Sequence, residues 1–133
     1  MGIGSKRWIW AGRVISALPA ILMLSSGVNI AIKSPPVMEG FARLGYPETV
    51  APVIGVVAFV SAALYAIPAT SVLGAILLTG YLGGATASHL RIGDPFFPPV
   101  IVGVVVWAGL FLRDARLRAL ISFRRLRLIT KQR

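Results

Sequence analysis

Four apolar stretches, separated by short polar or proline-marked breaks, dominate the chain. They cover approximately residues 8–32, 50–66, 70–89 and 97–112. A helix needs about 20 apolar residues to cross the hydrocarbon core of a bilayer, and each stretch reaches or approaches that length. The pattern therefore predicts an all-α fold, an integral membrane four-helix bundle. Its transmembrane domain would be residues 1–112, and a basic juxtamembrane tail would follow over 113–133.

The breaks between the stretches contain residues that end or redirect helices. Residues 33–48, KSPPVMEGFARLGYPE, are polar and contain both proline and glycine, so we expect a loop there. Pro68 predicts a tight turn between the second and third stretches, because proline cannot continue a helix. Pro98 and Pro99 suit the first turn of the fourth stretch. Pro19 is expected to kink the first stretch unless neighbouring groups bond to the carbonyl that it frees.

The composition agrees with a membrane location. Apolar residues make up 56% of the chain and charged residues only 14%, whereas soluble domains have about 45–50% and about 25%. The first stretch follows basic residues, as a signal peptide does, but it is longer than the usual apolar region of about 7–15 residues. We therefore interpret it as a retained first span.

The net charge of +10 comes largely from the basic tail. Basic clusters directly after a membrane helix are typical topology signals and contacts for anionic lipid headgroups. An acidic protein partner is the alternative, and nucleic acid is not expected. The tail residues concerned are Arg113, Arg116, Arg118, Arg124, Arg125 and Arg127.

The positive-inside rule gives an orientation for the bundle. Lys6, Arg7 and Arg13 lie at the start of the chain, and the tail is strongly basic. The charges of the first and third breaks cancel. An even number of spans places both termini on one side, so we expect both to be cytoplasmic.

The chain has no cysteine and a single histidine, His89. Disulfides, thiolate metal ligands and cysteine-bound iron–sulfur clusters are therefore excluded, as is a bis-histidine haem within one chain. A metal site would need His89, Asp94 and Glu39 to meet from separate segments, and we expect none.

Polar residues at the outer ends of the spans are candidates for a ligand site. The topology brings them to one region, where a small polar pocket with apolar walls would accept a hydrophobic ligand such as a quinone ring. His89 would share a proton near neutral pH, and Arg43 or Arg91 would hold an anionic or carbonyl group. The candidates are Asn29, Glu39, Arg43, Tyr46, Tyr81, His89, Arg91 and Asp94.

A simpler interpretation is a helix end. Placing an ionisable residue at the end of a span costs much less free energy than placing it in mid-membrane. Arg91 and Asp94 would then be loop residues that pair with each other. No acid lies close enough to Ser25, Ser26 and Asn29 in sequence to suggest a catalytic triad.

The third stretch contains small residues at a spacing of four, Gly80, Gly84 and Ser88. In membranes such residues allow helix backbones to approach closely. We therefore predict that these three residues pack this helix against a neighbour. A phosphate-binding loop is excluded, because the glycines lie in mid-span without a preceding strand or the required lysine.

Two segments together resemble the DoxX-like family of small bacterial four-helix membrane proteins. They are SGVNIAIKSPPVMEGFARLGYPE and GYLGGATASHLRIGDP. The resemblance implies a multi-pass protein of the inner membrane. It also implies a link to quinones, since some relatives are the membrane subunit of a thiosulfate:quinone oxidoreductase.

Three functions remain open from the sequence. The first is an accessory or ligand-binding subunit without catalysis of its own, which binds a protein partner or a second copy. The second is the membrane subunit of a quinone-linked oxidoreductase. The third, a small-molecule carrier, is weaker because four spans without an internal repeat would need a dimer to build a gated path.

Overall fold

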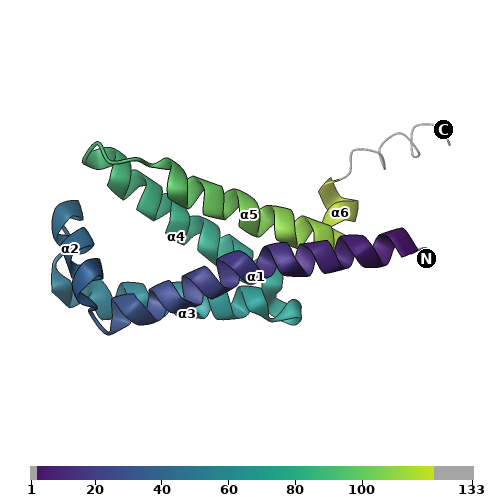
Figure 1. Ribbon diagram of the computed structural model, residues 1–133, viewed down its shortest axis with the longest axis horizontal. Helices are drawn as coiled ribbons and strands as arrows, with labels where there is room; N and C mark the ends of the chain where they lie inside the picture. Colours follow the sequence, from purple (N-terminus) through teal and green to yellow (C-terminus); the bar gives the residue numbers. More distant parts are fainter. Residues whose placement is uncertain (1–2, 122–133) are drawn as a thin grey trace.

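A computed structural model describes residues 3–121, and over that range it contains helices and turns but no strand. Four long helices run along one another, with α2 at one end and α6 at the other (Figure 1). The predicted all-α fold is thus confirmed. The helices are α1 (Ile3–Ala31), α2 (Pro35–Leu44), α3 (Ala51–Ala66), α4 (Ser71–Arg91), α5 (Phe97–Arg113) and α6 (Ala115–Ile121).

Within residues 3–121, three helical segments are long and apolar enough to cross a membrane: Lys6–Ala31, Glu48–Ala66 and Pro68–Arg91. The helix Phe97–Arg113 is also apolar, but it has only 17 residues. The predicted apolar helices are therefore present. The fourth segment is shorter than the other three, because the second reaches 19 residues with the 3-10 turn Glu48–Val50 that precedes α3.

The outer surface of the bundle is apolar. Leu18 and Val53 are 66% exposed, and Val104 is 63% exposed. Soluble monomers rarely expose large contiguous apolar patches. Exposed apolar side chains on several helices are the expected surface of a bundle that faces lipid.

The expected loop over residues 33–48 is wrong for Pro35–Leu44, which form α2. Pro35 and Pro36 occupy the first turn of the helix, where proline's missing N–H has no cost. Gly45 ends the helix in the left-handed conformation, with φ of 79°, which glycine adopts without steric strain. The same residues that suggested a loop are thus the signals that begin and end a short helix.

A small core of its own holds α2 to the bundle. Phe41 is 8% exposed and packs with Ile30 of α1 and Ala51 of α3. The ring of Phe41 also lies 5.8 Å, centroid to centroid, from that of Tyr46. These contacts place α2 across the ends of α1 and α3.

Close approach of the long helices depends on glycines other than those predicted. A Cβ atom at Gly55 would lie 2.5 Å from a backbone nitrogen of α1, and one at Gly74 would meet the backbone of Tyr65. At Gly80 and Gly84 a Cβ would meet nothing within 4 Å. The prediction that Gly80 and Gly84 pack α4 against another helix is therefore wrong for contacts within this chain.

The centre of the bundle joins α3 to α5 through Tyr65, which is fully buried. Its hydroxyl donates a hydrogen bond to the carbonyl of Val106 at 2.7 Å. Arg113 donates from Nη2 to the carbonyl of Tyr65 at 2.8 Å, and its guanidinium carbon lies 4.8 Å from the centre of the tyrosine ring. Sequence reasoning placed Arg113 in the tail, whereas here it is the last residue of α5 and bonds to α3.

Candidate functional site

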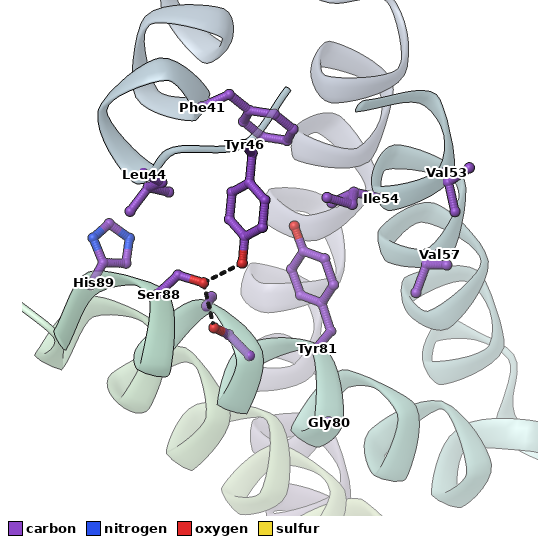
Figure 2. Close-up of a pocket in the computed structure, with 12 residues that line it drawn as sticks. Phe41, Leu44, Tyr46, Val53, Ile54, Val57, Gly80, Tyr81, Ser88 and His89 are labelled. Carbon is purple, nitrogen blue, oxygen red and sulfur yellow. Dashed lines mark hydrogen bonds between the residues drawn. The ribbon is translucent and has the colours of Figure 1, made fainter. Parts of the chain in front are cut away.

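A pocket of about 310 Å³ lies at the α2 end of the bundle, between α2, α3 and α4 (Figure 2). Two glycines of α4, Gly80 and Gly84, line it, so the space that they leave open forms part of the pocket. Most of the wall is apolar and comes from Phe41, Leu44, Val53, Ile54, Val57 and Ala85.

Two hydroxyls close one side of the pocket. The hydroxyl of Tyr46 lies 2.6 Å from Oγ of Ser88, and that oxygen lies 2.8 Å from the carbonyl of Gly84 (Figure 2). A serine hydroxyl has one proton to donate. If Ser88 donates to Gly84, then Tyr46 must donate to Ser88, so the donors of both hydroxyls are already used. Ser88 thus anchors the segment after α2, and its role in packing α4 against a neighbour stays a prediction.

Tyr81 supplies the pocket with a free polar group. Its side chain rises from α4 into the space between Tyr46 and Ile54 (Figure 2). Among the described residues, the Tyr81 hydroxyl has no hydrogen-bond partner, whereas those of Tyr46 and Tyr65 do. A phenol in an apolar wall is able to orient a ligand that carries a hydrogen-bond acceptor.

His89 stands at the edge of the pocket, beside Leu44 (Figure 2). Its Nδ1 is buried without a hydrogen-bond partner in the described part of the chain. It lies 3.7 Å from Oδ2 of Asp94, which is too long for a hydrogen bond but close enough for attraction once the imidazole is charged. The ring thus stands between the pocket and an acidic group.

Two arginine contacts join the C-terminal end of α2 to the last residue of α4 and to the connection after it. Nη2 of Arg43 lies 2.5 Å from Oδ2 of Asp94. Arg91 donates to the carbonyl of Leu44 at the last turn of α2. Asp94 therefore pairs with Arg43, and the expected pairing of Arg91 with Asp94 is wrong.

Six of the eight candidate residues line the pocket or form the contacts beside it, and two, Asn29 and Glu39, do neither. Asn29 donates to the carbonyl of Ser25 one turn earlier in α1, at 2.9 Å. Glu39 is exposed on α2 and lines no part of the pocket. No group of three metal-binding side chains occurs among residues 3–121. The six residues are Arg43, Tyr46, Tyr81, His89, Arg91 and Asp94; their role in ligand binding stays a prediction.

Sequence reasoning missed the apolar wall that α2 contributes. Phe41 and Leu44 line the pocket, and Val37 and Met38 pack on the small core beneath α2. Positions 37, 38, 41 and 44 follow the spacing of one face of a helix. This periodicity was visible in the sequence, and it would have identified both the helix and its buried face.

The predicted lipid- or partner-contact residues divide into two groups. Arg116 and Arg118 lie on α6, directly after Arg113. The other three, Arg124, Arg125 and Arg127, lie outside the described residues.

A comparison with protein-family models identifies the family of the chain. The model of the DoxX-like family matches residues 14–111. The chain belongs to the DoxX-like family. The match spans most of α1 through most of α5 and includes every residue that lines the pocket, but it stops before Arg113 and α6. No curated protein and no solved structure matches the chain.

DoxX proteins are small membrane proteins, in keeping with the three apolar helices long enough to cross a bilayer. The resemblance seen in the sequence is thereby confirmed. Membership of the DoxX-like family supports a membrane location.

Proposed function

We propose that this DoxX-like protein is a ligand-binding or accessory subunit of the inner membrane. Its ligand would be a lipophilic small molecule with a compact polar head, bound in the pocket at the α2 end. The observation that carries the proposal is the hydroxyl of Tyr81, which has no hydrogen-bond partner among the described residues and lies in a mostly apolar pocket. Catalysis by this chain alone is not part of the proposal.

The size and lining of the pocket support a ring-shaped head group. A volume of about 310 Å³ lies at the lower end of ligand pockets, which span about 300–1,000 Å³. Phe41 and Tyr46 supply aromatic faces, and Tyr81 supplies a donor for a ring carbonyl. A benzoquinone ring has flat faces and carbonyl acceptors, and so matches this arrangement.

Access from the lipid side supports a membrane-dissolved ligand. Val53 and Val57 line the pocket and are 66% and 48% exposed. The wall that they form on α3 therefore belongs also to the apolar outer surface. A hydrophobic ligand would reach the pocket sideways from the bilayer, with its tail remaining among the acyl chains.

We keep the predicted topology, in which four helices cross the membrane and both termini lie in the cytoplasm. The α6 end carries Arg13, Arg113, Arg116 and Arg118, and the α2 end carries balanced charges. This distribution follows the positive-inside rule and would place the pocket near the outer face of the membrane.

A second function, the membrane subunit of a quinone-linked oxidoreductase, is favoured by His89. An imidazole between a ring-sized pocket and a carboxylate is suited to pass the protons that accompany quinone reduction. The chain has no cysteine to hold an iron–sulfur cluster, and in this function a partner protein would supply the electrons.

The test uses purified full-length protein in detergent and decylubiquinone as the probe, with quenching of protein fluorescence as the readout. Gly84→Leu fills the pocket and should abolish saturable binding. Gly83→Leu is the matched control, because Gly83 is equally open but lies in a groove between α4 and α5. Tyr81→Phe should weaken binding about fivefold, the loss of one hydrogen bond. Equal binding by the wild-type protein and Gly84→Leu would refute the proposal.

A further inference from the structure

At the opposite end of the bundle, two adjoining hollows share a cationic rim. Their volumes are about 320 Å³ and about 420 Å³, and both are lined by Arg13, Pro68 and Arg113. The first hollow extends toward α6 and includes Arg116. The second extends along α1 toward the middle of the bundle. Neither hollow shares a residue with the pocket at the α2 end.

Arg113 is held in place at the junction of the hollows. Its Nη2 bonds to the carbonyl of Tyr65, and its guanidinium carbon lies over the tyrosine ring. A guanidinium has five N–H donors, and the bond to Tyr65 uses one of them. Because Arg113 lines both hollows, its remaining donors are suited to bind an acceptor oxygen there.

The acidic group in the first hollow does not neutralise the arginines. Asp114 lies between Arg113 and α6, and its Oδ1 accepts hydrogen bonds from the backbone nitrogens of Arg116 at 2.8 Å and Leu117 at 3.3 Å. The carboxylate thus caps the start of α6. In the described part of the chain it forms no ion pair, so three arginines meet one acid. The rim therefore favours an anion.

The second hollow gives this anion site an apolar extension. Ser16, Ala17, Ala20, Ile21 and Leu24 line it on successive turns of α1. From Ser16 to Leu24 the helix rises about 12 Å, at 1.5 Å per residue. Small side chains at positions 17 and 20 leave the groove open. A cationic rim that continues into an apolar groove is complementary to an amphiphile with an anionic head and an apolar tail.

We propose that one anionic phospholipid binds here, with its phosphate between Arg13, Arg113 and Arg116. One of its acyl chains would lie along the groove on α1. Arginine binds phosphate through two parallel hydrogen bonds, and the rim lies at the end of the spanning helices, where headgroups are found. This inference is independent of the ligand proposed for the α2 end.

The experiment is native mass spectrometry of the full-length protein in detergent, titrated with dioleoylphosphatidylglycerol or dioleoylphosphatidylcholine. One phosphatidylglycerol should bind more tightly than phosphatidylcholine. A cation near an anionic lipid contributes about 1 kcal/mol, so Arg13→Gln and Arg116→Gln should each weaken binding about fivefold. Arg7→Gln is the matched control: Arg7 is exposed on α1 and lines neither hollow, so its change should leave affinity within about twofold.

Arg113 also bonds to Tyr65, so removing its charge could destabilise the fold. Arg113→Lys is therefore the second variant, because it keeps the positive charge. This variant should fold but bind phosphatidylglycerol more weakly, because lysine lacks the paired donors of arginine. Ala17→Phe should block the groove and weaken phosphatidylglycerol binding. Leu18→Phe, at an exposed neighbouring position outside the groove, should not.

Three results would overturn the proposal. Equal affinity for the two lipids would show that the rim does not select a headgroup with a net negative charge, as the proposal requires. Equal losses in Arg7→Gln and Arg13→Gln would indicate diffuse attraction. The third result is displacement of the lipid by inorganic phosphate or by a polyglutamate peptide, together with unchanged lipid affinity in Ala17→Phe. It would assign the rim to a free anion or to an acidic protein segment.

Discussion

The hydroxyl of Tyr46 lies 2.6 Å from Oγ of Ser88, and this pair joins the segment after α2 to α4. The relay continues from Ser88 to the carbonyl of Gly84. The pair therefore supports both the position of α2 and the wall of the pocket.

Tyr46→Phe should destabilise the protein, and Tyr81→Phe should not. The first change removes a hydrogen bond and leaves Ser88 without its donor, at a cost of about 1 kcal/mol. The second removes a hydroxyl that has no partner among the described residues. Thermal unfolding in one detergent, followed by circular dichroism, measures both. A larger loss for Tyr81→Phe would show that its hydroxyl has a structural partner.

Gly74→Ala should be strongly destabilising, whereas Gly80→Ala should be tolerated. A Cβ at Gly74 would meet the backbone of Tyr65, and overpacking typically costs about 1–3 kcal/mol. At Gly80 nothing lies within 4 Å, and alanine favours the helix. Unfolding midpoints of the two variants in the same detergent test this. Equal destabilisation would mean that Gly80 contacts a second chain.

The Arg43–Asp94 ion pair should contribute little to stability. The Arg43 side chain is 68% exposed, and exposed pairs are worth about 0–1 kcal/mol because water and salt screen them. A double-mutant cycle with Arg43→Gln and Asp94→Asn should give a coupling of that size, which decreases at high salt. A coupling above about 2 kcal/mol would identify this pair as a main support of α2.

Single cysteines should report the topology, because the chain contains none of its own. Glu39→Cys, at the α2 end, should react with a membrane-impermeant maleimide in intact cells. Ala69→Cys, in the turn between α3 and α4, should react only after the membrane is opened. Both positions are exposed. The reverse labelling pattern would invert the orientation, and labelling of both positions in intact cells would contradict the span count.

The apolar runs predicted the long helices well, because hydrophobic length is a property of the sequence itself. The α2 helix was missed because Pro35, Pro36 and Gly45 end helices in most contexts, and only the spacing around Phe41 shows that here they flank one. Local residue types thus located the boundaries correctly and misidentified what lies between them.

The candidate site was predicted less well, because it depends on side-chain direction. Asn29 lies on α1, which leads into α2, but its amide bonds to its own helix. Whether Gly84 meets a helix or a cavity depends on the angle between α3 and α4, which sequence spacing does not specify. Arg113 could be assigned to the tail or to the core only after the length of α5 was known.

The shortness of α5 has a consequence for the surrounding membrane. Seventeen residues rise about 26 Å, whereas the hydrocarbon core of a bilayer is about 30 Å thick. For α5 to cross, the lipids beside it must compress by a few ångströms, at a modest cost for each ångström of mismatch. The longer helix α1 imposes no such compression. The protein would therefore deform the bilayer on one flank, and this asymmetry would draw it toward thinner membrane regions or toward neighbours that share the deformation.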